Sequence, residues 1–108
     1  MKGVEATGME RFEVTPREVA AIHRCLSSKV CRRLFKALYR EGRMNITALA
    51  RRVGCTNRKG VTYLRVLAGI GVVEEELAAG LHIFKLKNGR LTELIKETMK
   101  LLEGESGG

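Results

Sequence analysis

Apolar positions along this chain follow a helical spacing in five segments and a strand-like composition in two. The helical segments, in which apolar residues return every three or four positions, are residues 16–26, 29–41, 48–53, 56–69 and 90–102. Two runs of strand-forming residues, 72–77 and 81–87, flank a short loop that contains glycine and predict a β-hairpin. Met-Asn-Ile at residues 44–46 predicts a further short strand. The pattern therefore predicts a mainly helical chain with a small hairpin.

Capping residues predict where two of these helices begin. Thr15 precedes Pro16, and Glu18 stands three residues after Thr15, which is the arrangement of a capping box with proline in the first turn. We expect Thr47 to cap the third helix and Gly54 to end it, because threonine and glycine favour those two positions.

One side of each helix is apolar and is expected to face a shared core. In the first three helices these residues are Val19, Ala20, Ile22, Cys25, Leu26, Cys31, Leu34, Phe35, Leu38, Leu49, Ala50 and Val53. On the last helix they are Leu91, Leu94, Ile95, Thr98, Leu101 and Leu102. A chain of this length has room for one small core.

Composition excludes several classes of protein. The 108 residues are 44% apolar and 30% charged, as in one folded domain, and no apolar run reaches the roughly 18 residues of a membrane span. We expect residues 1–14 to be a flexible arm, 15–102 the domain and 103–108 a disordered tail. Three cysteines make no disulfide framework and the first residues resemble no signal peptide, so we expect a cytoplasmic protein. All twelve acidic residues are Glu and Gln is absent, which favours a thermophilic archaeal source.

The net charge of +8 is concentrated in the middle of the chain. Residues 15–71 hold thirteen Lys and Arg against two Glu, whereas the segments before and after are slightly acidic. Basic residues gathered in this way favour a polyanionic partner, because neutralised phosphates release their counterions. The alternative is that these side chains only solvate helix surfaces.

Two segments and the order of the elements resemble the winged helix-turn-helix regulators, particularly the ArsR-like group. In ITALARRVG, residues 46–54, Ala50 is the small residue where two helices cross and Gly54 makes the turn. YLRVLAGIGVV, residues 63–73, is similar to the end of the group's recognition helix and the start of its wing. The resemblance spans residues 27–87. It implies a three-helix core, a β-hairpin wing, extra helices at both ends, and a recognition helix in the major groove of DNA.

The fourth helix begins with Asn57, Arg58 and Lys59, so its cations lie at the end whose dipole is already positive. Such an end carries unpaired N–H groups and forms a receptor for anions. The resemblance implies that the residues able to meet base edges are Asn57, Arg58, Val61 and Thr62, with phosphate as the alternative for Arg58. Expected phosphate contacts are Lys59, Arg65, Arg51, Arg52, Lys85 and Lys87.

Three features depart from the ArsR-like pattern. Gly60 stands where the group has an apolar residue that packs inward, and we expect the helix to rotate and bury Val61 instead. The wing opens with Glu74, Glu75 and Glu76 and has no basic tip, so we expect it to add little to DNA affinity. The cysteine-rich motif of metal-sensing members is absent.

Little in the sequence supports metal binding or catalysis. Cys25 and Cys31 fall on apolar stripes, and a free cysteine is commonly a buried hydrophobic residue. His23 and Cys25 lie two positions apart on a helix, so their side chains diverge and cannot bind one metal ion together. Cys25 and Cys31 are the only candidate pair, because the interruption between the first two helices is able to bring them together. The sequence has no Asp, no glycine-rich phosphate loop and no Ser/His/acid motif. We therefore expect no enzyme, no metal and no cofactor.

The apolar face of the last helix can cover its own domain or pair with a second copy of the chain. We favour a homodimer in which the first helix completes the interface, as the resemblance implies. The expected contact residues are Ile22, Leu26, Leu91, Leu94, Ile95, Thr98, Leu101 and Leu102. Two-fold symmetry would present two recognition helices to a pseudo-palindromic site.

The sequence thus predicts a sequence-specific regulator of transcription that binds double-stranded DNA as a homodimer. Two alternatives stay open. The first is an architectural, chromatin-type DNA-binding protein with little sequence preference. The second is a winged-helix interaction module whose acidic hairpin and last helix face a protein partner. Only the second predicts that removal of Arg58 and Lys59 leaves function intact.

Overall fold

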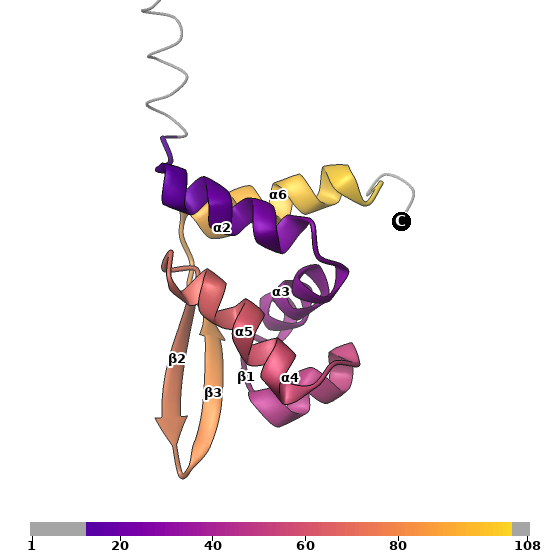
Figure 1. The fold of residues 1–108 in the computed structure, drawn as a ribbon, viewed down its shortest axis with the longest axis vertical. Helices are drawn as coiled ribbons and strands as arrows, with labels where there is room; N and C mark the ends of the chain where they lie inside the picture. The colour runs from indigo at the N-terminus through magenta and orange to yellow at the C-terminus, as the bar shows by residue number, and fades with distance from the viewer. Residues whose placement is uncertain (1–12, 105–108) are drawn as a thin grey trace, which may run out of the picture.

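The computed structural model describes residues 13–104 as a helical domain with a three-stranded sheet at one side (Figure 1). The elements in chain order are α2 (Pro16–Leu26), α3 (Lys29–Glu41), β1 (Arg43–Asn45), α4 (Ile46–Val53), α5 (Asn57–Ala68), β2 (Val73–Ala78), β3 (Leu81–Leu86) and α6 (Arg90–Leu102). In Figure 1, α2 and α6 lie together at the end of the molecule opposite the hairpin turn. Most of the expected arm and tail falls outside the described residues.

Local side-chain bonds explain where the helices start. The expected capping box of α2 is present, since the Thr15 hydroxyl accepts a bond from the Glu18 N–H at 3.1 Å and the Glu18 carboxylate accepts one from the Thr15 N–H at 2.9 Å. The expected cap of α4 is wrong. Asn45, not Thr47, caps this helix, because its side-chain oxygen accepts the Ala48 N–H at 2.9 Å. The helix and the strand before it therefore lie one to two residues earlier than predicted.

The sheet has the order β1-β3-β2, with both pairs antiparallel. The predicted hairpin is confirmed, and its turn consists of Ala79 and Gly80, which both have positive φ angles, of 53° and 76°. Two consecutive residues of this kind form the type of turn whose twist matches paired strands. On its other edge, β3 pairs with β1, which sets Asn45 opposite Ile83. The wing is therefore joined directly to the strand that leads into α4.

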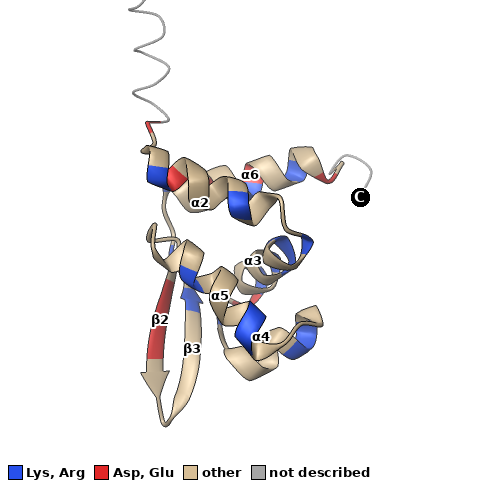
Figure 2. Ribbon diagram, viewed as in Figure 1, with Lys and Arg blue, Asp and Glu red and all other residues tan. Residues whose placement is uncertain are grey.

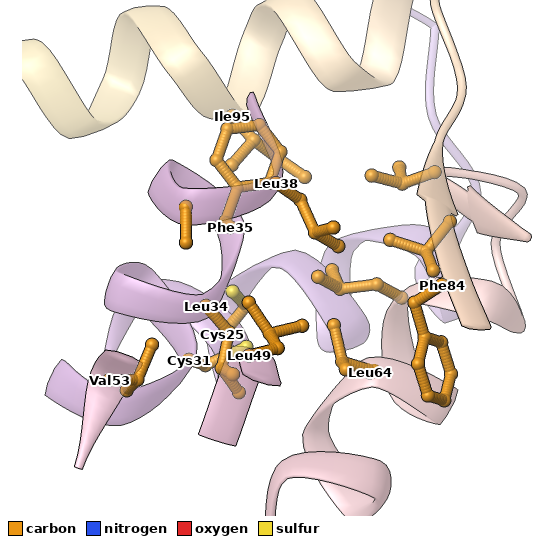
Figure 3. Packing of buried hydrophobic residues seen from close by; sticks show 14 of the residues in the cluster. Cys25, Cys31, Leu34, Phe35, Leu38, Leu49, Val53, Leu64, Phe84 and Ile95 are labelled. Atoms are coloured by element: carbon orange, nitrogen blue, oxygen red, sulfur yellow. The ribbon is translucent and has the colours of Figure 1, made fainter. Parts of the chain in front are cut away.

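The hydrophobic core is centred on α3 (Figure 3). Residues without solvent exposure come from all five described helices and from β3, and the largest are Leu34, Phe35, Leu38, Leu49, Leu64, Leu67, Phe84 and Ile95. Cys25 of α2 and Cys31 of α3 are also fully buried, and both are free thiols. A hydrogen bond with Cys25 and burial raise the pKa of the Cys31 thiol. The α2–α3 break thus brings this cysteine pair together inside the core.

Two of the predicted apolar stripes are displaced. Val19 on α2 is 49% exposed, because α2 packs through Ile22 and Cys25. On α6 the predicted Leu91 and Ile95 are buried, but the other two buried residues are Thr92 and Met99, so the buried face is rotated away from Leu94, Thr98 and Leu101. Thr92 tolerates burial because its hydroxyl donates a hydrogen bond to the Lys87 carbonyl at 2.6 Å. The outward position of Leu101 and Leu102, 84% and 60% exposed, follows from this rotation.

Candidate nucleic-acid interface

The turn between α4 and α5 fixes where the start of α5 lies. Gly54 ends α4 with a φ of 87°, a left-handed conformation that glycine adopts without strain. Thr56 then caps α5, and its hydroxyl accepts the Lys59 N–H at 3.0 Å. The remaining N–H groups of the first turn have no partner within the helix, as at any helix start. The helix that the sequence predicts over residues 56–69 is confirmed.

Gly60 permits a close approach between the two helices of the motif. It is buried, and a Cβ atom built on it would lie 3.0 Å from the Ile46 Cδ1 atom of α4. The side chain of Ile46 therefore fills the space that an apolar side chain at position 60 would occupy. The expected rotation of the helix is wrong, because Gly60 itself faces the core and Val61 is only half-buried.

The first turn and a half of α5 is exposed and basic. Asn57, Arg58, Lys59 and Thr62 are all exposed, and no acidic residue lies in the first turn. Within residues 13–104, neither Arg58 nor Lys59 has a carboxylate oxygen within 4.0 Å. Two of these side chains have partners. The Asn57 amide donates to the Thr47 hydroxyl at 3.2 Å, and the Thr62 hydroxyl donates to the Arg58 carbonyl at 3.0 Å.

The last turn of α4 adds Arg51 and Arg52, both exposed. Figure 2 shows basic positions at this end of α4 and at the start of α5. Arg52 forms an ion pair with Glu41 at 2.8 Å, in which both side chains are largely exposed, so the pair is weak and readily exchanged. Thr47, expected as the cap of α4, instead lies beside Asn57 and accepts its hydrogen bond, so it belongs to the candidate surface, where the sequence did not place it.

Arg65 is bound to the wing. Its guanidinium donates two hydrogen bonds to the Glu75 carboxylate of β2, at 3.1 and 2.9 Å. The Arg65 bonds, helped by the His82 Nδ1 contact at 2.9 Å, lower the pKa of Glu75 to about 2 from its ordinary value of 4.5. A member of the predicted DNA surface is thus neutralised by one of the wing's acidic residues, which lies ten positions away in sequence.

The wing carries its cations along its side and base. Lys85 lies opposite Arg43 of β1 and Glu74 of β2 in the sheet register. Arg43 forms an ion pair with Glu76 at 3.0 Å. Lys87 follows the end of β3 next to α6, at the opposite end of the strand from the hairpin turn. Arg43 was missed in the sequence analysis, because only the pairing of β1 with β3, forty residues apart, brings it to the wing.

The residues expected in a dimer interface fall into two groups. Ile22, Leu91 and Ile95 are buried within the core of the chain itself. Leu26, Leu94 and Thr98 are half-buried, and Leu101 and Leu102 are exposed. The surface open to a second copy is therefore smaller than the sequence suggested and lies toward the end of α6.

Two further observations concern membranes and metals. None of the helices in residues 13–104 combines the length and the apolar character needed to cross a bilayer. In the same part of the chain, no three His, Cys, Asp or Glu side chains converge in a group that could hold a metal ion.

Comparison with known proteins identifies the fold. No protein-family model and no curated protein matches the chain. Solved structures do match it. The AntR antimony-specific transcriptional repressor superimposes with a TM-score of 0.67 at 21% identity, over 84% of this chain and 82% of that one. The transcriptional repressor BigR from Xylella fastidiosa superimposes with a TM-score of 0.65 at 21% identity, over 94% and 96% of the two chains.

A third similar structure is the homodimeric winged helix-turn-helix DNA-binding domain of Mb0332 from Mycobacterium bovis, a possible ArsR-family regulator. It has a TM-score of 0.66 and 15% identity, and the match covers 86% of this chain and 91% of that domain. At these identities the likeness concerns the fold. The chain therefore has the winged helix-turn-helix fold found in ArsR-type regulators, with α4 and α5 as the helix-turn-helix and β2-β3 as the wing.

Proposed function

We propose that this protein is a regulator of transcription that binds double-stranded DNA as a homodimer, with the start of α5 in the major groove. The observation that carries the proposal is the exposed cation pair of the first turn of α5, which has no carboxylate partner within residues 13–104 and lies beside the basic last turn of α4. This arrangement occurs on a fold shared with structures described as transcriptional repressors. A catalytic role has no comparable support.

The geometry divides the proposed contacts into two groups. Arg58, Lys59 and Arg51 are available to DNA directly, Arg58 for base edges or phosphate and the other two for phosphate. The charges of Arg52 and Arg65 are offset by Glu41 and Glu75, so these two residues attract DNA less strongly while the ion pairs are intact. Asn57, Val61, Thr62 and Lys85 remain in the proposed surface. We leave Lys87 out because it lies at the base of the wing.

DNA binding is tested by fluorescence anisotropy with genomic duplex fragments from the source organism at several salt concentrations. The variant Arg58→Ala/Lys59→Ala is compared with Lys29→Ala/Arg90→Ala, which removes the same charge from exposed sites on other helices. The first variant should lose roughly 10- to 100-fold in affinity for a preferred fragment. The slope of the logarithm of its binding constant against the logarithm of salt concentration should become shallower by about 1 to 2 per protomer. The second should keep the preference.

Three results would decide against the proposal. Equal affinity of the wild type for all fragments would identify an architectural binder. A failure to bind any duplex at low salt would exclude DNA and leave the protein-interaction module. Equal losses in both variants would show that net charge, rather than the start of α5, controls binding.

The proposed dimer rests on the apolar residues that α6 leaves outside the core. Leu94, Thr98 and Leu101 recur along the helix at the spacing of an interhelical seam, and Leu102 extends it. We expect Leu101→Glu to produce a monomer in analytical ultracentrifugation at micromolar concentration, because a buried charge without a partner opposes association. The comparison variant Leu77→Glu changes an exposed leucine on the wing, 68% exposed against 84% for Leu101, and should stay dimeric. A wild-type protein that is monomeric in the same experiment would refute the proposed dimer contact along α6.

A further inference from the structure

A groove of about 550 Å³ lies between α3 and α6. All of its lining residues belong to α3, to α6 or to the position directly after α6, so it is separate from α4, α5 and the wing. It falls in the size range of sites that bind small molecules. The proposed DNA surface uses none of these residues, and the function of the groove can be tested independently of DNA binding.

The floor of the groove is aromatic and apolar. Phe35 is fully buried, and Tyr39 lies over it with the ring centroids 6.1 Å apart and the planes inclined by 22°. Tyr39 is 41% exposed and Met99 of α6 is buried beside the groove. A flat ring stacked on a second ring, with a thioether in the same lining, offers a stacking surface for a planar apolar group.

The rim of the groove is basic. Four of the eight lining residues are Lys or Arg and one is acidic, Glu103. The Glu103 carboxylate is already occupied, because it accepts bonds from Arg32 at 3.0 Å and from Lys36 at 2.8 Å. These bonds lower the pKa of Glu103, Lys36 contributing most, so this group stays ionised and paired. The excess positive charge therefore belongs to the remaining cations.

Those cations are Arg40, Lys96 and Lys100, and within residues 13–104 the two lysines make only long ion pairs, of 3.4 Å from Lys96 to Glu93 and 3.8 Å from each lysine to Glu97. The Lys96 ammonium also lies 5.0 Å from the centre of the Tyr39 ring. Across residues 13–104, no carboxylate oxygen comes within 4.0 Å of Arg40. Donors on both walls can therefore converge on an anion held above the ring.

We propose that this groove binds a small organic anion that combines an aromatic or apolar body with a carboxylate, sulfonate or phosphate group. The body stacks on Tyr39 and the acidic group is held by Arg40, Lys96 and Lys100. A single-stranded nucleic acid fits the groove less well, because such strands stack successive bases on several rings and only one ring is exposed here.

The probe for the test is 8-anilinonaphthalene-1-sulfonate, whose fluorescence rises when it binds an apolar surface. N-phenyl-1-naphthylamine has the same rings without the sulfonate and serves as the neutral comparison. Lys96→Gln/Lys100→Gln should weaken binding of the sulfonate roughly tenfold and leave the neutral probe within about twofold. Lys29→Gln/Arg90→Gln, which removes the same charge outside the groove, should change neither affinity. Tyr39→Ala should weaken both probes, with circular dichroism showing that each variant is folded.

Three outcomes would overturn the proposal. Unchanged sulfonate binding by Lys96→Gln/Lys100→Gln would place the probe elsewhere, on the exposed leucines of α6. Equal affinity of the wild type for the two probes would show that the cations do not recognise the acidic group. Stoichiometric displacement of the sulfonate by a single-stranded oligonucleotide would assign the groove to a nucleic acid.

Discussion

The substitution Gly60→Ala measures how closely α4 and α5 approach. Glycine inside a helix costs about 1 kcal/mol relative to alanine, so the substitution would stabilise a helix that had free space at this position. Here the new Cβ would lie 3.0 Å from Ile46 Cδ1, well inside the 3.5–4.0 Å of an optimal carbon contact. Ile46 is 7% exposed, so its terminal methyl has to shift within the core to relieve this contact. Overpacking of this kind costs about 1–3 kcal/mol, which gives a net loss of about 1 kcal/mol.

Ile46→Val removes the Cδ1 atom and no other, so it provides the matched background. Alone it should cost about 0.5–1.5 kcal/mol through the lost methyl group. In this background Gly60→Ala should become stabilising by about 1 kcal/mol, because the helix gain remains and the collision is gone. The coupling between the two substitutions should therefore reach about 2 kcal/mol.

Urea and thermal denaturation followed by circular dichroism measure the four free energies of unfolding. A change of 1 kcal/mol corresponds to about 4–8 °C in Tm for a domain of this size. Additive effects, with a coupling below about 0.3 kcal/mol, would show that Gly60 and Ile46 are not in contact and would refute the reasoning.

Three further predictions concern the cap of α4, the hairpin turn and the wing. Asn45→Ala should lower the free energy of unfolding by about 1 kcal/mol and Thr47→Ala by less than half of that, because Asn45 holds the cap. Ala79→Asn should raise it by up to about 1 kcal/mol, because Ala79 has a φ of 53° and asparagine tolerates that region better. Glu75→Gln should be less stable than the wild type above pH 4.5, where the lowered pKa makes Glu75 stabilising, and the difference should vanish as the pH falls toward 2.

The change in stability of each variant is measured from its urea denaturation midpoint. For Glu75→Gln the measurement is repeated across a series of pH values. Equal losses for Asn45→Ala and Thr47→Ala would contradict the position of the cap. A destabilising Ala79→Asn would show that the turn has another conformation. A difference between wild type and Glu75→Gln that persists unchanged at pH 2 would exclude the ionised carboxylate as its cause.

Elements defined by local signals could be predicted from the sequence, and contacts between distant segments could not. Thr15, Pro16 and Glu18 are enough to predict the start of α2, and the residues between β2 and β3 are enough to predict the hairpin. Asn45 and Thr47 are both good caps, and the choice between them is made by β1, whose pairing with β3 ends at Asn45. That pairing has no signal in the local pattern.

The same distinction applies to the candidate site. The exposed cations at the start of α5 follow from helix periodicity and a cap, and they were identified from the sequence. The bond between Arg65 and Glu75 depends on how the wing folds against α5, so Arg65 looked like a free cation. On α6, Leu94 and Met99 are both plausible core residues by spacing, and only the packing of α6 in the folded chain decides that Met99 is the buried one.

The junction of β1 and α4 has a consequence for how such sequences diverge. Asn45 pairs with Ile83 as the last residue of a strand and caps the helix that starts at the next residue, so no linker separates the two elements. An inserted residue there would break the cap and shift the strand register in one step. At the turn formed by Ala79 and Gly80, an insertion only lengthens the hairpin. Among chains that share this architecture, we therefore expect insertions and deletions at the hairpin turn and not at the junction of β1 and α4.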